Sequence, residues 1–156
     1  KSAAMRVSGP AQAKGIIRIS PANAHESFRQ GLAQNLGLNQ STLEPITGQY
    51  ACKPKYWLLV YNGYADHEPR ARLYYFDGST VVESDLPASG FPASFAITST
   101  GITSGAGGNY TVELSTPGAI ALVEIEASRI AGDKRTIAQR WASARIVAKN
   151  GTLKVI

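Results

Sequence analysis

The apolar residues between positions 28 and 36 follow the period of an α-helix. Phe28, Leu32 and Leu36 recur every four residues, which predicts one apolar stripe. The residues expected on the opposite side, facing water, are polar: His25, Arg29 and Gln30. Gly37 follows the last apolar position, where a helix commonly ends. The pattern therefore predicts an amphipathic helix that packs its stripe against another layer of structure.

The start of this helix carries its own signals. Pro21 suits a first turn, because proline lacks an N–H that the first turn would leave unbonded. Asn23 and Glu26 stand three residues apart, which predicts a capping box. Before the helix, residues 15–19 predict a short strand. After it, residues 38–55 contain two prolines and a glycine, which predict irregular structure.

From residue 56 the apolar pattern changes to that of strands. Residues 56–61 are all apolar or aromatic, so this strand should be covered on both faces and lie near the centre of the fold. Asp77-Gly78 then predicts a two-residue turn that joins strands at 70–76 and 79–85. That turn sets three expected cross-strand pairs: Phe76 with Ser79, Tyr74 with Val81, and Arg72 with Glu83.

The second half of the chain predicts further strands. They are expected at residues 94–98, 110–114 and 119–127, with a glycine-rich loop at 104–109, a turn at Pro117-Gly118 and a charged loop at 132–137. The clearest local signal is Asn150-Gly151, which predicts a terminal hairpin between residues 144–149 and 152–156. Its turn sets four pairs: Ala148 with Leu153, Ile146 with Val155, Lys149 with Thr152, and Val147 with Lys154.

Together these elements predict an α+β fold. We expect one N-terminal amphipathic helix packed on a mainly antiparallel β-sheet or β-sandwich, ending in a C-terminal β-hairpin. A length of 156 residues fits a single domain, 1–156, in which residues 1–14 are expected to be flexible or derived from a tag. No apolar run reaches the ~18 residues of a membrane span, so any export signal or anchor is expected upstream of Lys1.

The composition favours a protein outside the cytoplasm. Charged residues make up 17% of the chain, which is below the roughly 25% of ordinary soluble domains, and glycine, serine and threonine are plentiful. Cys52 is the only cysteine, so no internal disulfide can form, and we expect it to be a small buried residue.

Charge is distributed unevenly along the sequence. Residues 73–128 contain no lysine or arginine but six acids: Asp77, Glu83, Asp85, Glu113, Glu124 and Glu126. Residues 129–156 contain seven basic residues, including Arg135 and Arg140, and one acid. Either these charges neutralise one another on adjacent strands, with Glu124 and Glu126 opposite Arg140 or Arg145, or they form complementary faces that support self-association.

No motif in the sequence predicts a reaction. His67 lies in Asp66-His67-Glu68, but adjacent residues of an extended chain point to opposite sides and do not converge. The glycine-rich residues 104–108 lack the lysine and the helix that phosphate binding requires. We therefore expect no enzymatic activity, no cofactor and no structural metal site.

Aromatic residues suggest a contact surface instead. Six of the seven tyrosines lie between positions 50 and 75, beside Trp57. Trp57 and Tyr61 fit either the core or an exposed binding platform, and Tyr64, in a predicted loop, is the better candidate for a contact with a partner. The pI near 9.5 would attract phosphate. However, no recognition helix or stacking motif accompanies the basic residues, so we expect no nucleic-acid partner.

Two passages resemble the soluble heads of type IV pilins and pseudopilins, particularly the minor, prepilin-like kind. One is Tyr-Trp-Leu-Leu-Val-Tyr at 56–61 followed by Arg-Ala-Arg-Leu-Tyr-Tyr-Phe at 70–76; the other is the terminal strand–turn–strand at 144–155. Together they cover about 25 of the 156 residues. The long hydrophobic N-terminal helix and the paired-cysteine loop of many pilins are not in this sequence, and a strand before the helix is unusual for such heads.

The resemblance implies a head domain separated from its anchor helix. It implies a non-enzymatic, extracytoplasmic structural or interaction protein, most concretely a subunit of a surface filament or secretion-related assembly. Its partners would be proteins, including copies of itself, with membrane contact only through the missing anchor. The alternative from the residues alone is a small secreted binding module for carbohydrate or peptide, with an aromatic platform around Trp57 and Tyr64.

Overall fold

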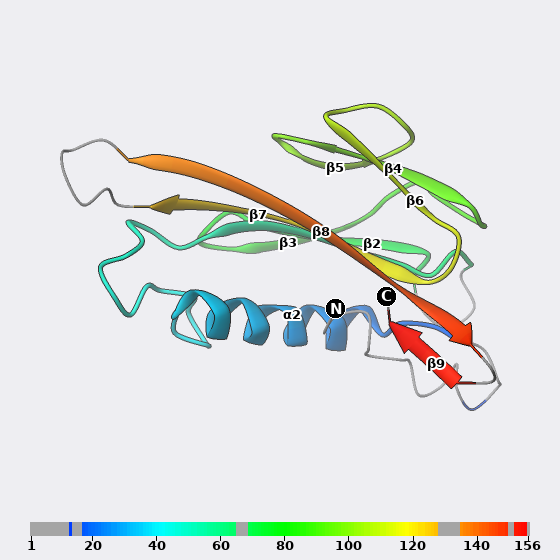
Figure 1. The fold of residues 1–156 in the computed structure, drawn as a ribbon, viewed down its shortest axis with the longest axis horizontal. Helices are drawn as coiled ribbons and strands as arrows, with labels where there is room; N and C mark the ends of the chain where they lie inside the picture. Colours follow the sequence, from blue (N-terminus) through cyan, green and yellow to red (C-terminus); the bar gives the residue numbers. More distant parts are fainter. Residues whose placement is uncertain (1–12, 14–16, 65–68, 128–134, 150–151, 156) are drawn as a thin grey trace.

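The chain folds into three layers, with a helix on one face of a large sheet and a small sheet on the other (Figure 1). The computed structural model describes residues 13, 17–64, 69–127, 135–149 and 152–155. The helix, α2, is Pro21–Leu36. The large sheet has the order β3-β2-β1-β7-β8-β9, and the small sheet has the order β5-β4-β6. All their strand pairs are antiparallel.

Nine strands lie in the described part of the chain. In the large sheet they are β1 (Lys55–Tyr61), β2 (Ala71–Phe76), β3 (Val81–Asp85), β7 (Gly118–Ala127), β8 (Thr136–Lys149) and β9 (Thr152–Val155). In the small sheet they are β4 (Ala93–Thr98), β5 (Gly101–Ser104) and β6 (Tyr110–Leu114). The turn at Pro117-Gly118 therefore leads from the small sheet to the large one and does not join paired neighbours.

The predicted α+β class is wrong, because the structure is mainly β. The structure is about 50% strand and 14% helix, and its described part contains one short helix, α2, and two antiparallel sheets. Most of the strand that the sequence did not predict belongs to β8, which begins at Thr136. The sequence predicted a charged loop at 132–137 and no element from there to residue 144.

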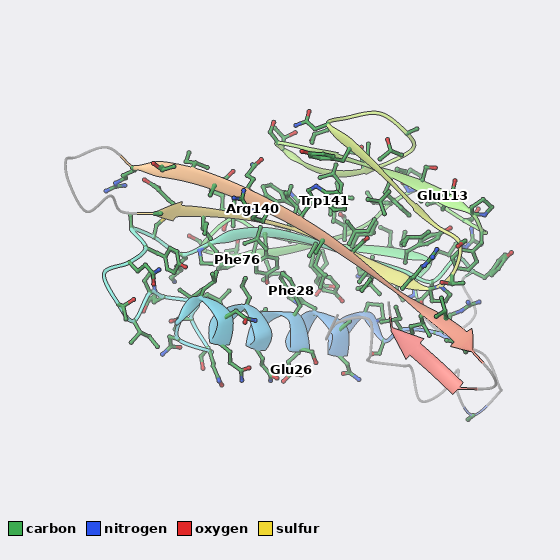
Figure 2. All side chains as sticks on the ribbon, in the orientation of Figure 1. Glu26, Phe28, Phe76, Glu113, Arg140 and Trp141 are labelled. Carbon is green, nitrogen blue, oxygen red and sulfur yellow. The ribbon has the colours of Figure 1, made fainter. Side chains whose placement is uncertain are left out.

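Strand β1 separates two hydrophobic cores, as its apolar pattern predicted. Its residues Tyr56, Leu58 and Val60 belong to the core under the helix, and Trp57, Leu59 and Tyr61 belong to the core under the small sheet. The predicted stripe of Phe28, Leu32 and Leu36 packs against the first of these cores. Figure 2 shows Phe28 directed from the helix toward the sheet and Glu26 directed away from it.

The two ends of the helix differ in how well they were predicted. Gly37 ends the helix with φ 63°, and the N–H of Leu38 donates to the carbonyl of Ala33 at 2.8 Å. The predicted capping box is wrong, because the N-cap is Ser20 and no side chain caps the first turn. Asn23 instead lies within the helix.

The segment before the helix is fixed by a side chain. The predicted strand at 15–19 lies partly outside the described residues, and residues 17–19 form no regular strand. The buried Asn62 side chain accepts a hydrogen bond from the N–H of Ile19 at 2.7 Å and donates to its carbonyl at 2.9 Å. Asn62 thus supplies the pairing that a neighbouring strand would otherwise give.

The hairpin between β2 and β3 has a longer turn than predicted. Phe76 pairs with Val81, and Arg72 pairs with Asp85, so the register is shifted by two residues from the predicted one. The Asp77 carboxylate accepts hydrogen bonds from the N–H groups of Ser79 and Thr80 at 2.7 and 2.8 Å, which stabilises a four-residue turn. A shift of two keeps every side chain on its predicted face.

The terminal hairpin is confirmed residue by residue. Strand β9 pairs with the end of β8 in the register that Asn150-Gly151 predicts, from Lys149 opposite Thr152 to Ile146 opposite Val155. Only the last four residues of β8 take part in this pairing, whereas Gly118–Ala127 of β7 pair with residues 136–145. This difference in length leaves part of β8 at the edge of the sheet.

Candidate functional site

The predicted aromatic platform does not form. Trp57 is buried and stacks on Tyr75, with ring centroids 4.9 Å apart. Tyr61 is fully buried, and its hydroxyl donates to the carbonyl of Gly90. Tyr64 alone of the three is exposed, and its ring meets the edge of Phe91. Trp57 and Tyr61 are therefore part of the hydrophobic core and cannot form a ligand-binding platform with Tyr64.

Four of the six acidic residues of the middle segment form ion pairs within the fold: Glu83, Asp85, Glu124 and Glu126. Glu124 lies 3.4 Å from Lys55 and is opposite Gln139, while Glu126 lies 3.1 Å from Arg135. Neither glutamate is opposite Arg140 or Arg145, which pair with Val123 and Gly118 of β7. Arg72 binds both Glu83 and Asp85. Of these ion pairs only Glu126–Arg135 joins residues 73–128 to residues 129–156, because Lys55 and Arg72 lie in the first part of the chain. The expected neutralisation of the two segments on adjacent strands is therefore limited to this one pair.

The other reactive side chains are dispersed. His67 lies outside the described residues. His25, predicted to face water, is half-buried: its Nε2 is 2.6 Å from the Tyr56 hydroxyl, and burial with the nearby Arg29 charge lowers its pKa to about 4. Cys52, predicted to be buried, is exposed. Among the residues that the structure describes, no three His, Cys, Asp or Glu side chains gather as a metal site would need.

The outer side of β8 is a long open edge of the large sheet. Between Ile137 and Arg145 this strand pairs with β7 on one side, and no described strand pairs with it on the other. We call this open side the β8 edge. In Figure 1 it follows the orange half of the long strand, before β9 begins. Unpaired backbone at a sheet edge is a template for pairing with another chain.

The direction of the backbone groups identifies which residues this edge presents. The carbonyl of Glu126 accepts a hydrogen bond from Ala51, beside β1, so the groups of its partner Ile137 point away from β7. Ile146 is separated from Ile137 by an odd number of positions, and its N–H donates to the carbonyl of Pro117, on the β7 side. Because direction alternates along a strand, the outward N–H and C=O groups belong to the odd-numbered residues: Ile137, Gln139, Trp141, Ser143 and Arg145.

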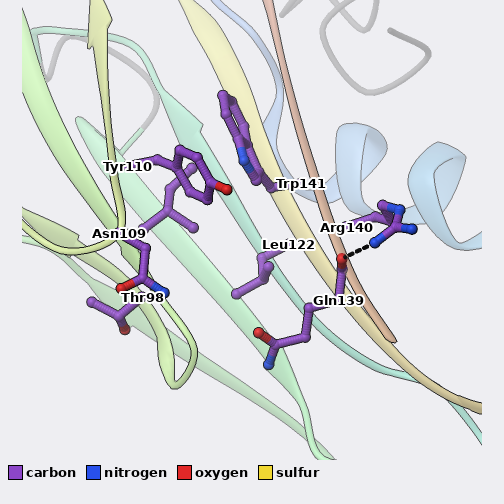
Figure 3. A pocket seen from close by; sticks show the side chains of 8 residues that line it. Thr98, Asn109, Tyr110, Leu122, Gln139, Arg140 and Trp141 are labelled. Atoms are coloured by element: carbon purple, nitrogen blue, oxygen red, sulfur yellow. Dashed lines mark hydrogen bonds between the residues drawn. The ribbon is translucent and has the colours of Figure 1, made fainter. Parts of the chain in front are cut away.

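A cleft of about 350 Å³ opens between this strand and the small sheet. Tyr110 of β6 and Trp141 of β8 form its aromatic wall, with ring centroids 5.3 Å apart, and 55% and 39% of their surfaces are exposed. Figure 3 shows the two rings at one end of the cleft, Gln139 and Thr98 toward the other, and Leu122 between them. We call it the Tyr110–Trp141 cleft. It offers an amphipathic aromatic surface of the kind that is enriched at binding sites.

Polar groups line the rest of the cleft. The Gln139 side-chain amide donates to Glu124 and to the carbonyl of Ser99, each at 2.8 Å, which fixes its position. The Arg140 guanidinium lies 2.9 Å from the outward carbonyl of Gln139, as the dashed line in Figure 3 marks. The site can therefore accept an extended chain along the β8 edge and one of its side chains in the cleft.

Sequence reasoning missed this site. No role was assigned to Trp141, and Ile137 was expected in the charged loop at 132–137. The available signal was the run at 136–145, Thr-Ile-Ala-Gln-Arg-Trp-Ala-Ser-Ala-Arg, which contains no proline or glycine and could continue a strand. Its small residues and two arginines interrupt the continuous apolar pattern by which β1 was recognised.

Comparisons with protein-family models, with curated protein sequences and with solved structures each gave no match. The resemblance to pilin heads is thereby neither supported nor refuted. In the part of the chain that the structure describes, no helix has the length and apolar character needed to cross a membrane.

Proposed function

We propose that this chain is a non-enzymatic structural and interaction protein that acts outside the cytoplasm as a subunit of a surface filament or secretion-related assembly. The observation that carries this proposal is the β8 edge, where five outward-pointing residues present backbone groups that no described strand uses. Such an edge gains hydrogen bonds when a strand from another chain is added, and assembly through main-chain pairing depends on this gain.

Two further observations support an assembly role. The edge carries exposed apolar side chains, Ile137 and Trp141, which are 66% and 39% exposed. Monomeric proteins usually protect long edge strands with charge, bulges or proline, and only Arg140 interrupts the middle of this one. The low charge content and the abundance of glycine, serine and threonine favour a location outside the cytoplasm.

Sedimentation velocity over a range of protein concentrations tests the proposal. The decisive variant is Ser143→Pro, which removes one outward N–H and places a ring on the edge, where proline is tolerated in a sheet. The matched control is Ser143→Ala, which keeps the N–H group. We expect wild type and Ser143→Ala to associate as concentration rises and Ser143→Pro to stay monomeric, with unchanged far-ultraviolet circular dichroism.

Two results would count against the proposal. If the wild-type protein stays monomeric at millimolar concentration, the proposal that it is a self-assembling subunit is contradicted. Association that Ser143→Pro leaves unchanged would place the contact elsewhere than the β8 edge.

A second candidate function is supported by the Tyr110–Trp141 cleft. A secreted binding module would hold a sugar ring or a peptide side chain against these two aromatic residues, beside the side chains of Asn109 and Gln139. This differs from the platform around Trp57 and Tyr64, because Trp57 is buried.

Tryptophan fluorescence separates the two candidates. The chain has two tryptophans, so the Trp57→Phe variant makes Trp141 the sole reporter. A binding module predicts a saturable change in Trp141 emission with an oligosaccharide or a short peptide, and loss of that change in Tyr110→Ala. Emission that stays constant across both ligand classes would leave the assembly role as the better account.

A further inference from the structure

We propose that the strand added to the β8 edge is β3 of a second copy of this chain, so that the large sheet continues from one molecule into the next. This inference rests on the proposed assembly function and names the partner surface. Strand β3 is the terminal strand at the opposite side of the large sheet, and Val82 on it is 54% exposed. The two edges are therefore available on one molecule at the same time.

Charge distinguishes this pairing from the alternatives. Strand β3 carries Glu83 and Asp85, which share the single guanidinium of Arg72, so one negative charge is left over. The β8 edge carries Arg140 and Arg145, and neither forms an ion pair within the described residues. Two β3 strands would repel each other, and so would two β8 strands, whereas β3 and β8 attract.

The faces of the two strands also match. Glu83 is opposite Tyr74 and Arg140 is opposite Val123, and both partners belong to the core under the helix. Val82 is opposite Tyr75 and Trp141 is opposite Leu122, on the side of the small sheet. A shared sheet would thus place acid beside base on one face and apolar beside apolar on the other.

Strand direction gives an independent check. Three strands lie between β3 and β8 and each neighbouring pair is antiparallel, so β3 and β8 run in the same direction. A copy displaced across the sheet without rotation would therefore pair its β3 with β8 in parallel. This head-to-tail contact does not close on itself, so it can repeat along a filament.

The hydrogen-bonding groups agree with parallel pairing. The N–H of Asp77 donates to the carbonyl of Thr80, and the N–H of Leu86 donates to the carbonyl of Ala71. Even-numbered residues of β3 therefore direct their backbone groups toward β2. The outward groups belong to the odd-numbered residues, Val81, Glu83 and Asp85. In a parallel ladder an inward-directed residue lies opposite an outward-directed one and the bonds are slanted. With Val82 beside Trp141, Glu83 lies opposite Ala142 and bonds the outward groups on either side of it. The side chain of Glu83 is then diagonal to Arg140.

Charge reversal tests the pairing by sedimentation velocity. Glu83→Lys gives one chain two positive edges, and Arg140→Glu gives one chain two negative edges. We expect each variant alone to associate at least ~10-fold more weakly than wild type, and an equimolar mixture to recover association, because each edge then meets one of opposite sign. The double variant Glu83→Lys/Arg140→Glu should recover it within one chain. Glu113→Lys, on β6 in the small sheet and away from both edges, is the matched charge control (Figure 2).

The outcomes separate this inference from the proposed function. If Ser143→Pro abolishes association but Glu83→Lys does not weaken it, the β8 edge is the acceptor and β3 is not its partner. A closed dimer that Arg140→Ala strengthens, because this variant removes a repelling charge from both strands, would identify pairing of two β8 strands and overturn the inference. If either single reversal has lost its fold by circular dichroism, the double variant decides: a folded double variant that stays monomeric overturns β3–β8 pairing.

Discussion

The imidazole of His25 lies flat on the phenol ring of Tyr74, with ring centroids 4.1 Å apart and an angle of 11° between the planes. The same imidazole is 2.6 Å from the hydroxyl of Tyr56. The helix is thus joined to the large sheet by an aromatic stack and a polar contact. Burial, together with the charge of Arg29, lowers the pKa of His25 from 6.5 to about 4, so the ring is neutral at pH 7.

This arrangement predicts that acid weakens the attachment of the helix. In the unfolded chain His25 takes up a proton near pH 6.5, whereas in the folded chain it does so only near pH 4. Its contribution to stability is therefore complete above pH 6.5 and is lost as the pH falls toward 4. Because the ring is partly exposed, we expect a loss of roughly 1–3 kcal/mol in unfolding free energy.

Urea unfolding at several pH values measures this contribution. His25→Phe keeps an aromatic ring on Tyr74 but cannot titrate, so its unfolding free energy should fall less than that of wild type between pH 7 and 4. Equal losses in the two proteins would show that His25 is not the group responsible.

The close contact between Gly118 on β7 and Ala144 on β8 predicts that a larger side chain at position 118 destabilises the fold. A Cβ atom there would lie 2.7 Å from the carbonyl oxygen of Ala144 on β8, which is backbone and cannot move aside easily. We expect Gly118→Ala to lower the unfolding free energy by about 1–3 kcal/mol. Gly31→Ala is the control, because nothing lies within 4 Å of that Cβ, and in a helix it should raise stability by ~0.5–1 kcal/mol. Chemical denaturation of both variants checks the pair; equal effects would contradict it.

The surroundings of Cys52 predict that its thiol reacts slowly with alkylating reagents. Partial burial, a hydrogen bond to Glu126 at 3.4 Å and the charge of that carboxylate raise the pKa of Cys52. Since the thiolate is the reactive form, iodoacetamide should alkylate Cys52 more slowly than it alkylates a free cysteine at pH 8. Glu126→Gln should raise the rate by about two- to fivefold. An unchanged rate would mean that the carboxylate does not control the thiol.

The sequence predicted those parts of the fold that local signals determine. Residues 56–61 are apolar throughout, so their central position follows from the need to cover both faces. Asn150-Gly151 fixes a two-residue turn, so the register of the terminal hairpin follows from it. Gly37 ended the helix where expected. In each case the deciding residues lie next to one another in the chain.

The errors arose where distant residues decide the structure. His25 was placed in water because its neighbours on the helix are polar, but Tyr56 and Tyr74 cover it from the sheet. The Asp77 carboxylate accepts hydrogen bonds from two backbone N–H groups and so stabilises a four-residue turn. The dipeptide Asp77-Gly78 alone predicted a two-residue turn. The candidate site was missed because Trp141 and Tyr110 are 31 positions apart and meet only when β8 and the small sheet come together.

Residue-resolved amide hydrogen exchange tests the central claim, that the β8 edge is open in the single molecule and closes on assembly. In dilute protein the outward amides of Gln139, Trp141 and Ser143 should exchange much faster than the inward amides of Ala138 and Ala142, which bond to β7. In concentrated, associated protein the outward amides should become as protected as the inward ones. Protection of the outward amides already in the dilute monomer, or no gain of protection on association, would contradict the account.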